Sequence, residues 1–290
     1  MKKYGEVLEN VSLKEYNTYK IGGYAKYIIK PFSITHLINL IEYLKNKSIN
    51  YLVLGKGSNV ILPDENYNGA IILLDNLNKI NIDNEIVEVE AGINLSLLIN
   101  KLIENNIGGL ENLCGIPGTL GGAIIGNAGC HGCEISDYID EVKYLENGII
   151  KTIKKEECNF KYRESIFKYN KNIIVLGCKF KLLKRDKEEM LNKVKEFILK
   201  RKNTQPLDYP NAGSVFRNPE NLSSGKIIED LGLKNYHIND AYISEKHANF
   251  IINKGNATSE DIKELIKYIQ KKVIELHGIE LVLEQIIIKY

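Results

Sequence analysis

Apolar and polar residues in the first eighty positions follow the periods of a strand, a helix and a second strand. Residues 26–30 predict a strand, and Ser33 is a suitable N-cap for the helix that follows. Residues 51–54 predict the next strand, so this region is typical of a strand–helix–strand unit. The apolar positions of the helix recur every three or four residues: Ile34, Leu37, Ile38, Ile41 and Leu44.

A second unit of this kind is predicted to begin at residues 86–90. Asn94 is the expected N-cap of its helix, which Gly108 and Gly109 end. Its apolar face consists of Leu95, Leu98, Ile99, Leu102 and Ile103. Residues 142–184 then predict strands, with a hairpin at Asn147-Gly148 because both positions of that turn need positive φ.

From residue 186 onward the chain predicts two long helices and a closing strand. A short helix that ends at Gly232 and a strand-like run at residues 250–253 are predicted between the two long helices. Asp186 caps the first helix, and a domain junction is placed just before it. Four of its apolar residues are predicted to face inward: Leu191, Val194, Phe197 and Ile198. Thr258 and Asp261 form the capping-box pattern of the second helix, and residues 281–288 predict the strand.

Composition narrows the class of protein. The 290 residues are 44% hydrophobic and 26% charged, as in soluble globular proteins, and allow two or three domains. The net charge of +2, without a basic block, argues against nucleic acid as a partner. We expect no secretion signal and no membrane span. Five irregularly spaced cysteines suit a reduced cytoplasm, where we expect a monomer.

Two glycine-rich segments indicate a cofactor that carries phosphate. Residues 115–129 interleave glycine with apolar residues, and residues 55–59 follow a short apolar run. Backbone without Cβ atoms can approach a large ligand, and successive N–H groups form anion sites. The second segment is not a dinucleotide fingerprint, because Val60 stands where the third glycine would be. It does not match a P-loop either, since no Gly-Lys-Ser/Thr follows at the required spacing.

Three polar clusters are candidates for chemistry, and each has a simpler structural interpretation. Arg163, between aromatic residues, could clamp a carboxylate or pair with Glu164 on the surface. Ser214 follows small residues and could be accessible to a ligand or serve in a turn. Glu245 and His247 would share one face if residues 244–250 were a strand.

The Cys130-His131-Gly132-Cys133 sequence contains a Cys-x-x-Cys motif, which occurs in zinc sites and in redox-active cysteine pairs. One Cys-x-x-Cys supplies only two zinc ligands, and the sequence has no second pair. Glycine surrounds the motif, where a redox pair would open a helix. We therefore expect no metal.

Taken together, the clusters resemble the UDP-N-acetylenolpyruvoylglucosamine reductase (MurB) family of peptidoglycan precursor synthesis. The short subclass, without an extra lid loop, is the better match. The matching motifs cover most of the chain: residues 17–23, 54–59, 115–122, 127–129, 162–167, 205–206, 213–219, 244–250 and 281–284.

The resemblance implies a mixed α+β and α/β fold. A two-part FAD-binding region of the vanillyl-alcohol-oxidase-like (PCMH-type) kind would precede a C-terminal α+β substrate-binding domain. The implied domains are residues 1–78 and 79–186 for FAD and residues 187–290 for the substrate. The final strand, with Glu284, would return to the active site.

The family also implies non-covalent FAD, NADPH as co-substrate and a UDP-sugar substrate. Ser214 maps to the proton donor, and Arg163 and Glu284 map to the groups that stabilise the substrate carboxylate. To donate a hydrogen bond Glu284 must be protonated, which apolar neighbours would favour. The residues assigned to FAD are Gly55, Lys56, Gly57, Ser58, Asn59, Gly115, Ile116, Pro117, Gly118, Thr119, Gly121, Gly122, Asn127, Ala128 and Gly129. Those assigned to the substrate are Tyr162, Arg217 and Asn218.

The chain departs from the family pattern at Cys130-His131, and at Leu283 and Gln285, which flank Glu284. Two alternatives stay open at this point. One is a flavin oxidase that attaches FAD through His131, and the other is a non-catalytic nucleotide-binding module.

Overall fold

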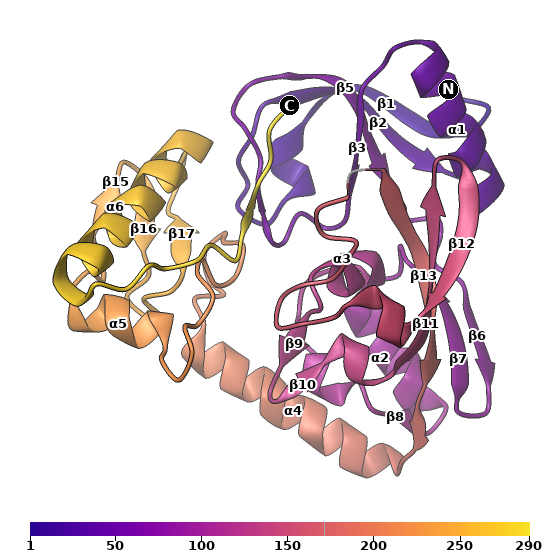
Figure 1. Ribbon diagram of the computed structural model, residues 1–290. Coiled ribbons are helices and arrows are strands. Elements are labelled where there is room, and N and C mark those ends of the chain that lie inside the picture. The colour runs from indigo at the N-terminus through magenta and orange to yellow at the C-terminus, as the bar shows by residue number, and fades with distance from the viewer. Residues whose placement is uncertain (171) are drawn as a thin grey trace. The chain divides into compact units, whose positions relative to one another are not determined.

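The protein consists of two compact units that are not continuous in sequence. The computed structural model describes residues 1–170 and 172–290 (Figure 1). Unit 1 comprises Met1–Glu9, Tyr27–Gly55 and Gly69–Lys200, and unit 2 comprises Asn10–Lys26, Lys56–Asn68 and Arg201–Tyr290. The division into three domains remains a prediction.

The first sheet has four strands in the order β1-β2-β5-β3. Their bounds are Gly5–Ser12, Tyr24–Pro31, Tyr67–Leu73 and Tyr51–Leu54. Helix α1 (Ile34–Asn46) begins as predicted, with Ser33 Oγ accepting a hydrogen bond from the amide of His36 at 3.3 Å. β3 runs parallel to β5, which lies between β2 and β3 in the sheet.

The second sheet has five strands in the order β12-β11-β13-β7-β6. Their bounds are Ile149–Lys154, Ile139–Glu146, Ile173–Lys181, Ile86–Glu90 and Ile80–Asp83. Every neighbouring pair is antiparallel, so the prediction of a second strand–helix–strand unit at residues 86–90 was wrong. The hairpin prediction is confirmed, with φ of 51° at Asn147 and 81° at Gly148.

One hydrophobic core serves both sheets of unit 1. It joins the inner face of α1 to residues of β5, β7, β11 and β13, and to helices α2 (Leu95–Glu104) and α3 (Leu120–Ile125). Asn94 caps α2 as predicted, although that helix ends at Glu104, before the two glycines. Strand β8 (Ile107–Gly108) pairs with β14 (Leu183–Lys184). The parts of unit 1 are connected by five short elements: η2 (Glu111–Leu113), β9 (Gly129–Cys130), β10 (Cys133–Glu134), η3 (Ile135–Asp137) and η4 (Lys155–Cys158).

Helix α4 (Lys187–Thr204) shows where the apolar pattern misled. Val194 and Phe197 pack against the core of unit 1, and Met190 is buried. Leu191 is 38% exposed and Ile198 is 49% exposed, so these two do not face inward.

Unit 2 combines helices α5 (Ser224–Asp230) and α6 (Ser259–His277) with a three-stranded antiparallel sheet. Its strands, in the order β15-β16-β17, are His237–Ile238, Ala241–Ile243 and Ile251–Asn253. Its core also takes in Tyr19 and Ile21, which follow η1 (Leu13–Tyr16), and Ile61 of β4 (Val60–Ile61). The predicted closing strand is reduced to β18 (Ile286–Ile287), which pairs in parallel with β4.

Residues 244–249 do not form the strand that their alternation indicated. Ser244 Oγ instead accepts hydrogen bonds from the amides of Lys246 and His247, at 3.1 and 3.4 Å, and closes a turn. Glu245 and His247 therefore do not share a strand face.

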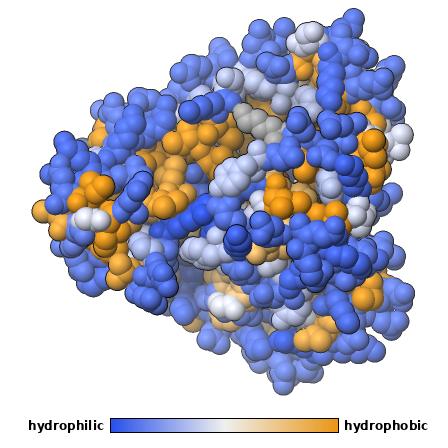
Figure 2. Space-filling view, in the orientation of Figure 1, coloured by the Kyte–Doolittle hydropathy of each residue, from blue (hydrophilic) through white to orange (hydrophobic). Residues whose placement is uncertain are grey.

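Hydrophilic residues predominate on the face shown in Figure 2, with apolar residues in separate patches. In the described part of the chain, no helix combines the length and apolar character needed to cross a membrane.

Candidate functional site

The glycine-rich segment of residues 115–129 is an ordered turn around α3. Leu120 and Gly121 donate amide hydrogen bonds to the carbonyls of Ile93 and Ala91, at 2.9 and 2.8 Å, and fix the start of the helix. A Cβ at Gly121 would lie 3.1 Å from the Cβ of Ala91, so glycine permits this close approach.

This turn leaves backbone donors available. Among the residues that the structure describes, the amides of Gly118 and Thr119 donate no hydrogen bond to a protein acceptor. Thr119 is nevertheless buried. Buried N–H groups without protein partners need an acceptor, and phosphate oxygens suit them.

The two predicted cofactor segments meet at one point of unit 1. A Cβ at Gly55, at the end of β3, would lie 2.9 Å from Thr119 Oγ1. In unit 2, a Cβ at Gly57 would collide with the carbonyl oxygen of Tyr16, and Gly57 has φ of 62°. Close packing within the protein therefore requires glycine at 55 and 57. The available amides of Gly118 and Thr119 fit a diphosphate cofactor such as FAD.

Asn127 has a structural part in the same segment. It is fully buried, and its Nδ2 donates to Glu134 Oε2 at 2.7 Å and to the Lys161 carbonyl at 3.0 Å. Its Oδ1 accepts from the Ser136 amide at 3.3 Å. These contacts fasten the glycine-rich segment to the turn that carries Arg163.

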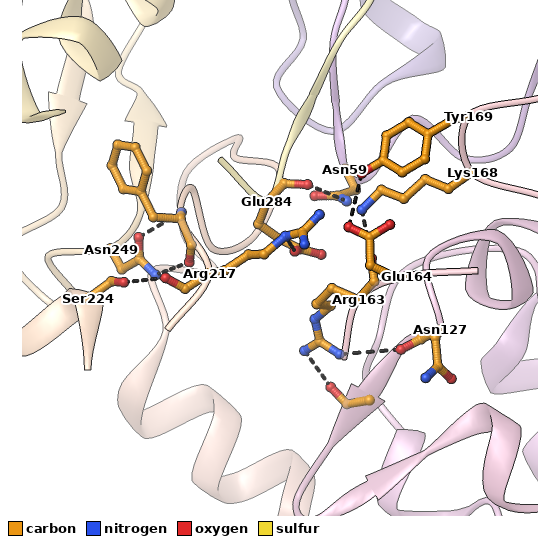
Figure 3. A network of polar contacts seen from close by, with 12 residues as sticks. Asn59, Asn127, Arg163, Glu164, Lys168, Tyr169, Arg217, Ser224, Asn249 and Glu284 are labelled. Carbon is orange, nitrogen blue, oxygen red and sulfur yellow. Dashed lines mark hydrogen bonds and ion pairs between the residues drawn. The ribbon is translucent and has the colours of Figure 1, made fainter. Parts of the chain in front are cut away.

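Arg163 occupies a tight turn closed by two hydrogen bonds between the backbones of Lys161 and Glu164. Its φ of 59° lies in the left-handed region. The guanidinium donates to the carbonyl of Gly129 at 2.8 Å and to that of Asn127 at 3.5 Å (Figure 3). The structure thus brings Arg163 to the end of the predicted cofactor segment, a contact that the sequence did not indicate.

Nearby groups hold this turn. Lys168 Nζ donates to the Arg163 carbonyl at 2.8 Å, and Glu164 accepts from the Tyr169 hydroxyl at 2.9 Å. Tyr162, assigned to the substrate, is 48% exposed, with its ring centroid 5.2 Å from the guanidinium carbon of Arg163.

In unit 2, the segment after Ser214 pairs with the segment that carries Glu284. The Glu284 amide donates to the Val215 carbonyl at 2.8 Å, and the Arg217 amide donates to the Val282 carbonyl at 2.9 Å. Phe216 and Leu283 are opposite each other in this antiparallel bridge. Ser214 and Glu284 therefore belong to neighbouring segments.

Two further groups fix Glu284. Arg217 Nε lies 3.3 Å from Glu284 Oε2, and both side chains are largely buried (Figure 3). Asn59 Nδ2 donates to the Glu284 carbonyl at 3.3 Å, so a residue assigned to FAD supports the predicted catalytic strand. The apolar neighbours Leu281 and Leu283 are present, but the structure adds a cation to these surroundings.

Asn249 supports the segment after Ser214 and was not among the predicted site residues. Its Nδ2 donates to the Phe216 carbonyl at 2.8 Å, and its Oδ1 accepts from the Phe216 amide at 3.0 Å. Its own carbonyl accepts from the Val215 amide at 2.9 Å. Its signals in the sequence were its place in the family-like motif of residues 244–250 and its position beside an apolar run. Asn218, assigned to the substrate, accepts from the Ser224 amide at 3.1 Å and is exposed.

The Cys130–Cys133 motif forms a hairpin in which the two residues oppose each other. Both carry thiol groups, and burial, reinforced by Asp137, raises the pKa of Cys133 to about 12. Such a thiol is a poor nucleophile at neutral pH. The His131 ring stacks on Phe197, with centroids 4.1 Å apart. Among the described residues, no group of three or more His, Cys, Asp or Glu could hold a metal ion.

Comparison with known proteins identifies similar families and relatives. Residues 25–152 match the FAD binding domain family, and residues 205–288 match the family described as UDP-N-acetylenolpyruvoylglucosamine reductase, C-terminal domain. The reductase of that name from Caldanaerobacter subterraneus is 42% identical over 283 residues, covering 97% of this chain and 93% of the relative. The Caldicellulosiruptor bescii reductase is 44% identical, covering 94% of this chain and 88% of the relative.

A solved structure has the same architecture. The crystal structure of UDP-N-acetylenolpyruvylglucosamine reductase (MurB) from Thermus caldophilus superposes with a TM-score of 0.82 and 33% identity, over 98% of this chain and 99% of that one. Together with the family matches, it confirms the predicted fold class of a FAD-binding region followed by a C-terminal domain.

Proposed function

Because this chain belongs to the UDP-N-acetylenolpyruvoylglucosamine reductase family and is a flavin-dependent reductase that uses FAD, we propose roles for its residues in that reaction. The substrate is the enolpyruvyl ether of UDP-N-acetylglucosamine, and reduction of its double bond gives the lactyl ether, UDP-N-acetylmuramate. The reaction belongs to peptidoglycan precursor synthesis. When bound, FAD supplies the hydride, which originates from NADPH.

Ser214 is the proton donor. Hydride addition to one carbon of the double bond leaves an electron pair on the neighbouring carbon, and the Ser214 hydroxyl gives its proton there. The observation that supports this role is the antiparallel pairing of residues 215–217 with residues 282–284, in which Val215, the residue after Ser214, is hydrogen-bonded to Glu284. A hydroxyl held on a well-packed segment is positioned to act as a general acid.

Arg163 and Glu284 stabilise the substrate carboxylate as it takes on enolate charge. A guanidinium offers two parallel N–H groups to a carboxylate, and Arg163 is already oriented by the Gly129 and Asn127 carbonyls. Glu284 is proposed to donate the second hydrogen bond in its protonated form, with Arg217 Nε 3.3 Å from its Oε2. Donors placed before the reaction stabilise developing charge without reorganisation.

The glycine-rich backbone holds the cofactor without a covalent bond. The amides of Gly118 and Thr119 suit the diphosphate of FAD, and residues 55–59 are proposed to contact the cofactor as well. Tyr162 and Arg217 are proposed to contact the substrate. In the cell, the protein acts as a cytoplasmic monomer, and its product supports cell shape and division.

The decisive experiment is Ser214→Ala, followed by rapid-mixing absorbance of the flavin. General acid catalysis contributes about 10²–10⁴-fold, so reoxidation of the reduced flavin by the enolpyruvyl substrate should slow by that factor. Bleaching of the flavin by NADPH should keep its normal rate, because it takes no proton from Ser214.

Ser33→Ala, at the N-cap of α1, is the control and should leave both half-reactions unchanged. If Ser214→Ala slowed both half-reactions equally, the residue would shape the flavin site and would not be the acid.

A further inference from the structure

We infer that Gln285 is a positioning residue for Ser214, holding the peptide group from which the proton-donating side chain extends. The inference rests on the proposed role of Ser214. Gln285 itself is 3% exposed and has no access to the substrate.

The Gln285 side chain clamps the residues before Ser214. Its Nε2 donates to the carbonyl of Ala212 at 3.2 Å and to the carbonyl of Gly213 at 3.1 Å. The side-chain amide of Gln285 therefore uses both of its N–H groups as donors to two consecutive peptide groups. A carboxylate of the same shape would repel these oxygens, so this position requires an amide.

The clamped loop has one further hydrogen bond on this side, from the Gly213 amide to Asn211 Oδ1 at 3.0 Å. Gly213 has φ of 75°, and a Cβ built there would meet no atom within 4 Å. Its carbonyl carbon is bonded to the Ser214 nitrogen in a planar peptide, so fixing the carbonyl oxygen fixes the plane that leads into Ser214. Asn249 holds Val215 and Phe216 on the other side, which leaves Ser214 between two restraints.

Tyr19 anchors Gln285 in turn. The Tyr19 hydroxyl donates to Gln285 Oε1 at 3.1 Å. Tyr19 is fully buried, and burial raises its pKa well above the ordinary value, so the hydroxyl stays protonated as a donor. Asn253 Nδ2 donates to the Tyr19 carbonyl at 2.9 Å, and the Asn253 amide donates to the carbonyl of Pro210. Asn253 thus links Tyr19 to Pro210, in the loop that precedes Ser214.

The consequence is that two adjacent residues of one short segment have different roles in the same reaction. Glu284 takes part directly and the next residue, Gln285, sets the position of the acid. A misplacement of about 1 Å at a reacting group can cost about 10²-fold in rate. Loss of the clamp should therefore affect the step that uses Ser214 and spare the step that does not.

The test compares Gln285→Leu with Gln270→Leu in the FAD-loaded protein. Gln270 Nε2 makes a similar hydrogen bond, to the Leu281 carbonyl at 2.9 Å, but does not reach the Ser214 loop. For Gln285→Leu we expect reoxidation of the reduced flavin by the enolpyruvyl substrate to slow about 10- to 100-fold, with bleaching by NADPH unchanged. Gln270→Leu should leave both rates near normal.

Hydrogen–deuterium exchange of the substrate-free protein gives a readout independent of activity. Amides of residues 211–216 should exchange faster in Gln285→Leu than in wild type, and at the wild-type rate in Gln270→Leu.

Gln285→Glu and Tyr19→Phe keep the inference testable if Gln285→Leu does not fold. The carboxyl group introduced by Gln285→Glu can donate one hydrogen bond when it is protonated. The reoxidation rate of this variant, relative to wild type, should therefore rise as pH falls. Tyr19→Phe removes one anchor and should slow reoxidation only a few-fold.

The double variant Ser214→Ala/Gln285→Leu separates this inference from the proposed function. If Gln285 acts through Ser214, the double variant should reoxidise no more slowly than Ser214→Ala alone. Additive losses, an unchanged reoxidation rate in Gln285→Leu, or equal slowing of both half-reactions would overturn the inference. An unimpaired Ser214→Ala would instead overturn the role of Ser214.

Discussion

Arg163 illustrates how a single side chain is prepared for its role by backbone carbonyls. The guanidinium is held by Gly129 and Asn127, in a turn whose left-handed φ at Arg163 is itself an unusual conformation for a residue other than glycine. The orientation of the side chain is therefore fixed by contacts within unit 1. A substrate carboxylate would therefore meet a guanidinium that is already oriented.

We expect that lysine in the Arg163→Lys variant cannot replace arginine in the reaction with the substrate. One ammonium cannot keep both carbonyl contacts and also offer two parallel N–H groups to the substrate. A hydrogen bond to a charged group is worth about 1.5–3 kcal/mol, so reoxidation of the flavin by substrate should slow about 10- to 150-fold. Arg185→Lys, at an arginine 3.9 Å from Glu111, is the control. Near-normal turnover of Arg163→Lys would rule out the clamp.

His247 should make the stability of the protein depend on pH. Burial, assisted by the charge of Lys234, lowers its pKa below the ordinary value, and its Nδ1 accepts a hydrogen bond from the Asn249 amide at 3.2 Å. The unfolded chain takes up a proton near pH 6.5, before the folded one does. This contribution to stability is therefore present above about pH 6.5 and is lost as pH falls below it.

Urea unfolding at pH 7.5 and 5.5 measures this effect. The fall in unfolding free energy between the two pH values should be smaller in His247→Gln than in wild type. The same substitution at the exposed His237 provides the comparison. An equal fall in wild type and His247→Gln would contradict the assignment.

At the scale of elements, α6 is the best test of local sequence signals. The Thr258 hydroxyl accepts from the Asp261 amide at 3.1 Å, and the Asp261 carboxylate accepts from the Thr258 amide at 2.8 Å. Thr258→Ala should lower the unfolding free energy by about 1 kcal/mol, measured by denaturant titration. Thr35→Ala, on the exposed face of α1, should change it by less than about 0.5 kcal/mol. A loss at Thr258 no larger than at Thr35 would show that the cap contributes little.

Helix starts were predictable because the signals lie within four residues of each other. Ser33, Asn94 and Thr258 all cap the helices that they were expected to cap. The order and direction of the strands in the sheets were harder to predict from the sequence. The antiparallel partners of β7 come from residues near 80 and 180, and their direction depends on packing across the whole unit.

The residues of the candidate site also differ in how far local sequence signals reveal their roles. Arg163, Ser214 and Glu284 have predicted roles in recognisable motifs. Asn249 also stands in such a motif, but its hydrogen bonds, like those of Gln285, are to backbone that is remote in sequence. Residues 244–249 alternate like a strand, yet the Ser244 hydroxyl offers a local turn that competes with it. Local patterns reveal such residues only as polar positions beside apolar ones.

At the scale of the whole molecule, unit 2 is assembled from three separate stretches of chain. Tyr19, Ile21 and Ile61 lie in its core, although most of that core comes from residues after 200. Asp64 also caps α6, accepting from the Ser259 and Glu260 amides at 2.9 and 3.2 Å. The C-terminal residues therefore lack part of their own core and one helix cap.

We expect residues 201–290, expressed alone, to show no cooperative thermal unfolding by circular dichroism. Removing three large buried side chains leaves cavities that cost several kcal/mol each, comparable with the whole stability of a small domain. The full chain, measured under the same conditions, provides the reference transition. A sharp transition in the fragment would show that the N-terminal stretches are dispensable for its fold.

The parallel pairing of β4 with β18 also has a consequence in time. A ribosome releases Val60 and Ile61 more than 200 residues before Ile286 and Ile287, a delay of roughly 10–45 s at about 5–20 residues per second. During that interval Tyr19, Ile21 and Ile61 have no completed core to enter, and they are exposed to chaperones and proteases. Translation that stops before Ile286 would leave unit 2 without this pairing. Completion of unit 2 therefore depends on residues that are synthesised long after β4.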